Sequence, residues 1–111
     1  MADATKLKNL KIKTGVVKRL AKEKLCYEKE AKQQEEKVKQ LKAAEDGDEY
    51  VVRKQEEVLQ ECRAMVPDCA RRLTTAVDDL NLLLENGNDL AETDEYKAAQ
   101  QAILESKSVI S

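Results

Sequence analysis

The side chains of greatest chemical reactivity in this chain are three thiols, at Cys26, Cys62 and Cys69, and the chain has no histidine. The lack of histidine removes every Ser-His or Cys-His nucleophile pair and the commonest metal ligand. Cys62 and Cys69 lie seven residues apart, about 10 Å along a helix, which is too far for a disulfide. Three scattered thiols do not match a zinc pattern, and no glycine stands in a phosphate-binding loop motif. We therefore expect buried, reduced cysteines and predict no enzymatic activity, no cofactor and no bound metal.

Basic side chains offer a different chemistry, the binding of an acidic partner, and they gather in the first part of the chain. Residues 1–42 hold thirteen Lys and Arg against six Asp and Glu, whereas residues 43–111 hold seven against sixteen. A basic helix beside an acidic one favours antiparallel pairing, and the remaining positive charge can steer an acidic protein. The basic strip of the first segment consists of Lys6, Lys8, Lys11, Lys13, Lys18, Arg19, Lys22 and Lys24. The candidate partner-binding residues are five members of this strip and an arginine pair: Lys11, Lys13, Lys18, Arg19, Lys22, Arg71 and Arg72.

These basic residues also have simpler interpretations, which stay open at this point. The strip can be a solvated helix face, and Arg71 and Arg72 can pair with carboxylates such as Glu30 or Glu95. Nucleic acid is not an expected partner, because the net charge of the chain is −2 and its few aromatic residues offer no stacking platform. Membrane binding is not expected either, since the chain has no Trp or Phe to enter the interface and no long apolar run.

Two polar turn signals divide the chain into three helical segments. The first lies at residues 45–48, where Gly47 can take the left-handed conformation that ends a helix and Asp48 can cap the next one. The second lies at residues 86–89, after which Thr93 and Asp94 can cap a third segment. The predicted helices span about residues 5–44, 48–85 and 93–109.

Heptad spacing of apolar residues indicates how the segments pack. The second segment carries an unbroken series seven residues apart: Val52, Leu59, Val66, Leu73 and Leu80. This series is typical of a coiled-coil seam. The first segment has a similar stripe, interrupted by Lys13, Lys24 and Gln34, and we expect Gln34 to form a polar layer that fixes the register. Because the second series continues through Pro67, we predict that this helix bends at the proline but does not stop there.

These segment lengths favour one architecture. Two helices of about 38 to 40 residues joined by a short turn form an antiparallel hairpin roughly 60 Å long. The shorter third helix then covers part of the hairpin groove. We predict a single all-α domain over residues 1–111, an elongated, antiparallel, coiled-coil-like three-helix bundle with its second helix kinked at Pro67, and a monomer. The alternative is a coiled-coil dimer, in which a second chain supplies the missing core mass.

Several sequence blocks resemble one protein family, tubulin-binding cofactor A. The first two are KIKTGVVKRL at residues 11–20 and YEKEAKQQEEK at residues 27–37. Later blocks are VPDC with RRL at residues 66–73, and LEN and EYK at residues 84–86 and 95–97. The first two blocks together are highly specific, since no generic helix needs Thr-Gly-Val-Val inside a lysine run. The likeness covers nearly the whole chain.

The resemblance implies a small cytosolic, cytoskeleton-associated chaperone that needs no nucleotide and no metal. Members of that family capture β-tubulin released by the cytosolic chaperonin and hold it before other tubulin-folding cofactors assemble the α/β heterodimer. The family fold is a three-helix bundle with a kink at the proline of the second helix. The alternative function, which the heptad seam alone supports, is a structural coiled-coil adaptor or oligomerisation module without chaperone activity.

Overall fold

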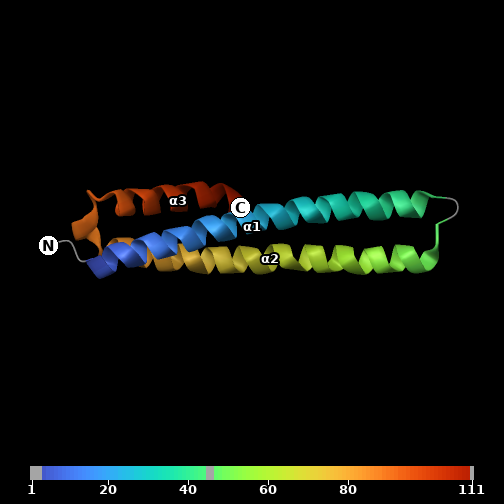
Figure 1. The fold of residues 1–111 in the computed structure, drawn as a ribbon, viewed down its shortest axis with the longest axis horizontal. Helices are drawn as coiled ribbons and strands as arrows, with labels where there is room; N and C mark the ends of the chain where they lie inside the picture. The colour runs from blue at the N-terminus through green and yellow to red at the C-terminus, as the bar shows by residue number, and fades with distance from the viewer. Residues whose placement is uncertain (1–3, 45–46, 111) are drawn as a thin grey trace.

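The computed structural model describes residues 4–44 and 47–110, and the described chain forms a narrow helical rod (Figure 1). Its helices are α1 (Ala4–Ala43), α2 (Glu49–Asn86), the short 3-10 helix η1 (Asn88–Leu90) and α3 (Asp94–Ile110). α1 and α2 lie antiparallel and side by side, while α3 runs back beside the N-terminal half of α1. The rod measures 71 × 18 × 17 Å. The prediction of an elongated, all-α three-helix bundle is confirmed.

The helices begin and end one residue from the predicted positions, and the expected residues cap α2 and α3. The Asp48 side chain accepts a hydrogen bond from the Tyr50 N–H at 2.9 Å, and Thr93 Oγ1 accepts one from the Tyr96 N–H at 3.2 Å. Both caps satisfy N–H groups that a helix start leaves without an intrahelical partner. Part of the first predicted turn, Glu45 and Asp46, lies outside the described residues.

The expected left-handed conformation at Gly47 is wrong, since no glycine in the described part of the chain has a positive φ. Glycine is needed there for space, because a Cβ on Gly47 would stand 2.8 Å from the carbonyl oxygen of Leu41. A Cβ on Gly87, where α2 ends, would stand 2.9 Å from the carbonyl oxygen of Leu83. Both turns therefore press a glycine against the backbone of the preceding helix, which no other residue allows without a shift.

The seam between α1 and α2 forms the centre of the core. Of its predicted heptad series, α2 buries Leu59, Leu73 and Leu80, while the two valines are half-buried. The buried apolar residues of α1 are Leu10, Val17, Leu20 and Val38. Aliphatic side chains of this size fill a narrow seam, so the core is long and thin instead of wide.

A glutamine pair in the seam forms the predicted polar layer. Gln34 Nε2 donates hydrogen bonds to the backbone carbonyl and to the side-chain oxygen of Gln55, both at 2.9 Å. A slip of one heptad would place Gln55 opposite Tyr27 or Leu41 and would leave both amides without this partner. The pair therefore favours the observed register over the neighbouring ones.

α3 runs along only part of the rod (Figure 1), and over that part it packs against both α1 and α2 and covers the groove between them. Its Ala99 and Ile103 join the main core cluster, together with Leu90 of η1. Beyond the end of α3, Val38 and Leu59 form the floor of the same groove, yet they are only 5% and 7% exposed. Something other than a third helix must therefore cover them.

Two ion pairs between α1 and α2 provide that cover. Glu35 lies 3.4 Å from Arg63, and Lys42 lies 2.8 Å from Glu56. All four side chains line the hollow above the valine and leucine floor. Exposed pairs of this kind contribute well under about 1 kcal/mol through charge alone. Their aliphatic stems shield the floor from water.

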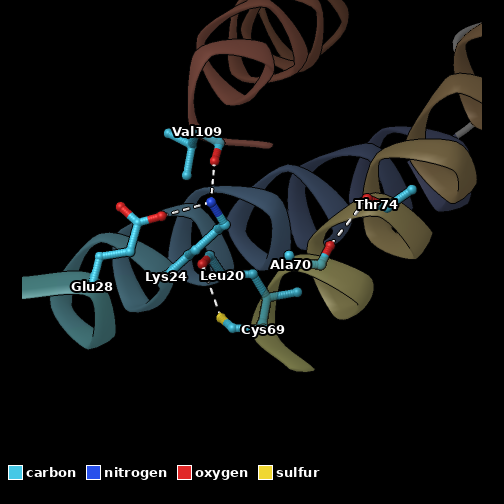
Figure 2. A network of polar contacts seen from close by, with 7 residues as sticks. All are labelled: Leu20, Lys24, Glu28, Cys69, Ala70, Thr74 and Val109. Atoms are coloured by element: carbon cyan, nitrogen blue, oxygen red, sulfur yellow. Dashed lines mark hydrogen bonds and ion pairs between the residues drawn. The ribbon is translucent and has the colours of Figure 1, made fainter. Parts of the chain in front are cut away.

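A buried lysine ties the end of α3 to α1 (Figure 2). Lys24 occupies a heptad position that apolar residues hold elsewhere, and its side chain is 7% exposed. Its Nζ donates to Glu28 Oε1 at 2.7 Å and to the backbone carbonyl of Val109, in the last turn of α3. A cation at this place also suits the negative end of the α3 dipole. The residue that interrupts the apolar stripe therefore anchors the third helix.

α2 is a continuous helix through Pro67. The prediction that the helix does not stop at the proline is confirmed, while the bend stays a prediction. Pro67 itself is exposed, whereas its neighbours Val66 and Cys69 remain in the seam, half-buried and buried. The apolar series thus passes the proline because the ring points away from the partner helix.

We expect Pro67→Ala to keep the helical content and to raise the free energy of unfolding, because proline in a helix interior costs ~3 kcal/mol relative to alanine. Circular dichroism melts of the two proteins, recorded side by side, measure the change. A lower melting temperature in the variant would mean that the packing of α2 against α1 needs the proline.

We expect Lys24→Met to lower the free energy of unfolding by about 1.5–3 kcal/mol, the range for hydrogen bonds to a charged group. The methionine keeps the apolar stem but leaves the Val109 carbonyl without its donor. Urea unfolding measures the change, with Lys29→Met, at an exposed lysine of the same helix, as the control. Equal losses in the two variants would contradict an anchoring role for Lys24.

Candidate partner-binding surface

All seven candidate binding residues lie on the surface of the bundle, but they do not form one strip. The five on α1 are Lys11, Lys13, Lys18, Arg19 and Lys22, and the two on α2 are Arg71 and Arg72, all of them exposed. An α-helix turns by about 100° per residue, so neighbours in the sequence point in different directions. As a result six of them divide between two grooves, one lined by α1 and α2 and the other by α1 and α3, while Lys13 lies outside both.

The first surface, which we name the arginine groove, is a hollow of about 580 Å³ between α1 and α2. It brings Arg19 of α1 together with Arg71 and Arg72 of α2. The carboxylates that line the same hollow are Glu23, Asp68 and Asp79. The Arg19 guanidinium lies 3.6 Å from Glu23, one turn along α1. Positive and negative charges are therefore balanced within this groove.

The interpretation that Arg71 and Arg72 pair with Glu30 or Glu95 is wrong. Both guanidinium groups contact Asp68 instead, at 3.4 and 3.2 Å. The reason is local, because residues three and four apart on a helix lie on the same face. The two arginine side chains are 73% and 65% exposed, so these pairs contribute little to stability and leave both guanidinium groups accessible to a partner.

The second surface, which we name the lysine groove, lies between α1 and α3. It consists of two hollows of about 320 and 290 Å³, and Lys18 lines both. Lys11 and Lys22 complete the α1 wall, and the α3 wall carries the carboxylates of Asp94, Glu95 and Glu105. The small residues of the lining are Thr14, Gly15, Ala21, Ala98, Ala102 and Ser106. The groove thus has a basic wall, an acidic wall and a shallow floor.

Lys13 lines neither groove, because two residues along α1 turn it about 200° away from Lys11. Sequence reasoning also missed the acidic wall on α3. The sequence did contain the pattern that places these residues on one face of the third helix, since Ala98 and Glu105 lie seven residues apart, as do Glu95 and Ala102. Sequence reasoning also missed Asp68 as the partner of the arginine pair, although Asp68 lies three and four residues before Arg71 and Arg72.

The described part of the chain offers neither a metal-holding group of side chains nor a membrane-spanning helix. Among residues 4–44 and 47–110, no group of three or more His, Cys, Asp and Glu side chains could hold a metal ion. No helix in these two ranges combines the length and the apolar character that a membrane span requires. The basic and acidic side chains that line the two grooves suit the binding of a partner through shape and charge.

The three thiols differ in exposure, so the expectation of buried cysteines is wrong for Cys26. It precedes the seam residue Tyr27 by one position and is therefore turned outward, whereas Cys62 is half-buried and Cys69 is buried. The Cys69 thiol donates to the carbonyl oxygen of Leu20 at 3.4 Å (Figure 2). Burial, followed by the nearby Glu23 carboxylate, raises the pKa of this thiol. A thiol of this kind is a weak nucleophile at neutral pH.

Comparison with known proteins identifies the family. The family model named "Tubulin binding cofactor A" matches residues 5–103. The chain belongs to the tubulin binding cofactor A family. The resemblance carried by residues 11–20 and 27–37 is thereby confirmed. The "Tubulin-specific chaperone A" of Gallus gallus is 61% identical over 106 residues, which cover 96% of this chain and 95% of that protein.

Solved structures of the tubulin binding cofactor A family share the fold. The structure described as "human tubulin chaperone cofactor a" is 54% identical with a TM-score of 0.78, and the match covers 92% of this chain and 98% of that one. A tubulin folding cofactor A from Arabidopsis thaliana is 34% identical with a TM-score of 0.84, covering 96% of this chain and 99% of that one. The three-helix arrangement therefore persists while two thirds of the residues change.

We expect a thiol reagent at mildly alkaline pH to modify Cys26 rapidly and Cys69 only when the bundle opens. Cys69 is shielded by the seam, and its raised pKa keeps the proton on the sulfur to higher pH. Brief alkylation followed by peptide mass spectrometry, over a series of pH values and with and without urea, measures both rates. Equal labelling of the two residues in the folded protein would show that the seam opens far more often than its burial implies.

Proposed function

We propose that this chain is a tubulin-folding chaperone, which captures β-tubulin released by the cytosolic chaperonin and holds it until the α/β heterodimer is assembled. The observation that carries the proposal is membership of the tubulin binding cofactor A family over nearly the whole chain. Binding is non-covalent and occurs on helix faces. It uses no nucleotide, since holding a client requires only contact and release.

The shape of the bundle suits this task. β-Tubulin without its α partner exposes an interface that would otherwise aggregate. A stiff rod 71 Å long, with grooves that no other part of the described chain fills, can lie along such a surface. Because the contact is non-covalent, the client is released by mass action when another partner competes for the same surface.

The charges of the two grooves support different roles. Tubulin is acidic, so exposed basic residues speed the encounter. Lys11, Lys18 and Lys22 make no ion pair with any residue in the described ranges, whereas the three arginines are each paired within their own helix. We assign steering to the lysines, with Lys13 adding to the same field. Arg71 and Arg72, joined by Arg19, serve as anchors, since arginine is favoured in interfaces.

The same function determines the setting in which the chain works. It acts in the cytoplasm, in association with the cytoskeleton, and binds neither nucleic acid nor membrane. Other tubulin-folding cofactors receive the same client and meet this chain only through it. The working form is a monomer, because a single rod leaves both grooves open to the client.

The proposal is tested by offering purified α-tubulin and β-tubulin separately to the immobilised chain. We expect retention of β-tubulin and not of α-tubulin. Retention of neither would favour the alternative, a structural coiled-coil adaptor or oligomerisation module, which the seam alone can explain. Retention of both equally would contradict the specificity for β-tubulin while leaving a general tubulin chaperone.

We expect Lys18→Glu combined with Lys22→Glu to slow β-tubulin association about tenfold at low salt, since steering acts on the association rate. The difference should shrink as salt rises, because the Debye length falls from ~10 Å at 0.1 M to ~3 Å at 1 M. Arg71→Glu combined with Arg72→Glu should instead raise the dissociation rate. Association and dissociation traces at several salt concentrations measure both effects.

The matched control reverses two exposed α1 lysines that line neither groove, Lys29→Glu with Lys32→Glu. It therefore has the same net charge as the variant that carries Lys18→Glu and Lys22→Glu. It should associate faster than the Lys18 and Lys22 variant. Melting temperatures of the unchanged chain and of the three double variants separate lost binding from lost folding. An association rate that is unchanged in the Lys18→Glu, Lys22→Glu variant, at both low and high salt, would mean that the basic strip is only a solvated helix face.

A further inference from the structure

Gly15 lies in the interior of α1, where the fold supplies no reason for a glycine. A Cβ added there would meet no heavy atom within 4 Å. The other two glycines differ, since a Cβ would approach a backbone oxygen to 2.8 Å at Gly47 and to 2.9 Å at Gly87. Glycine is also among the poorest helix formers. The chain therefore carries a destabilising residue that its own packing does not require.

The position of Gly15 in the lysine groove explains why a glycine occurs there. It lies in the lysine groove between Lys11 and Lys18, opposite Ala98 of α3. Without a side chain, the backbone of α1 is open to whatever enters the groove. Glycine allows another chain to approach a helix backbone more closely than any other residue does. The bare stretch of α1 thus fits contact with a partner and not with the chain itself.

The walls of the groove indicate the charge of that partner. The three lysines of the α1 wall make no ion pair with any residue that the structure describes, including the three carboxylates on the α3 wall. A groove with unpaired positive charge on one side and negative charge on the other is complementary to a segment of opposite polarity. Such a segment presents acidic residues to α1 and basic residues to α3.

The spacing of the lining residues indicates the shape of the partner. On α1, Lys11, Lys18 and Leu25 recur every seven residues, and on α3 Ala98 and Glu105 do the same. A heptad spacing on both walls matches a helix that packs along the groove. Leu25 is 52% exposed and would be covered by such a helix. The stretch from Lys11 to Leu25 is about 21 Å long, enough for roughly four turns.

We propose that the lysine groove receives a helix of the client, acidic along its edge toward α1, basic along its edge toward α3, and in direct contact with the α1 backbone at Gly15. The inference rests on the proposed function, because the client is β-tubulin. It adds to that function a specific contact site for the client, the lysine groove. The lysines that steer the encounter then become one wall of the final contact.

The test uses substitutions at Gly15, because stability and binding should change in opposite directions. Gly15→Ala should raise the melting temperature by roughly 2–5 °C through helix propensity. It should nevertheless weaken β-tubulin binding, since the added Cβ separates the two helices. Gly15→Leu should weaken binding about tenfold or more, as overpacking does in close contacts. Ala98→Leu, on the opposite wall, should weaken binding in the same way.

The control is Ala64→Leu, which adds a leucine at an exposed position of α2 outside both grooves and should bind as the unchanged chain does. Normal binding by Gly15→Leu, with the unchanged chain also binding β-tubulin, would overturn this inference alone. Failure of the unchanged chain to bind would overturn the proposed function. A change in the oligomeric state of the free chain on Gly15→Leu substitution would identify the groove as a self-interface and would also overturn the inference.

Discussion

The antiparallel seam between α1 and α2 is the constraint on which the rest of the molecule depends. The chain has no Phe and no Trp, so its core is made from narrow side chains such as Leu, Val and Ala. Without large aromatic side chains, the seam between the helices is thin. A thin seam has to extend over a long distance to bury enough apolar surface to stabilise the fold. The rod shape follows from this composition. The partial third helix and the charged cover of the remaining groove are two ways of closing the same seam.

Features set by local spacing were predictable from the sequence, and features set by the meeting of distant segments were not. The caps at Asp48 and Thr93, the buried leucines of α2 and the passage through Pro67 depend on residues a few positions apart. Lys24 appeared only as a break in the stripe, because its acceptor on Val109 is 85 residues away. Its role depends on where α3 ends beside α1. No periodicity within either helix contains that information.

On the candidate surface, too, local features could be predicted from the sequence and the grouping of distant residues could not. Six of the seven basic residues lie outside the predicted apolar stripe, and all six are exposed, as that placement favours. Lys13 holds a position on the stripe, yet it is exposed as well. The grouping of these residues could not be predicted, because it depends on how α1 is rotated against its two neighbours. Arg19 follows Lys18 directly in the sequence, yet Arg19 joins the arginines of α2 while Lys18 faces the carboxylates of α3. A strip of like charge in a sequence therefore becomes two surfaces of different character once a second and a third helix flank it.

This separation of seam and grooves allows binding to vary without loss of the fold. The residues that stabilise the rod point inward between α1 and α2, whereas the lysines and arginines of the grooves are exposed and contribute well under about 1 kcal/mol each to stability. A helix-weakening glycine is tolerated for the same reason, since it lies outside the seam. Exposed, hydrated charges also favour rapid encounter more than tight retention. Under the proposed function, a surface of this kind favours contacts that form quickly and are released by mass action, without an energy source.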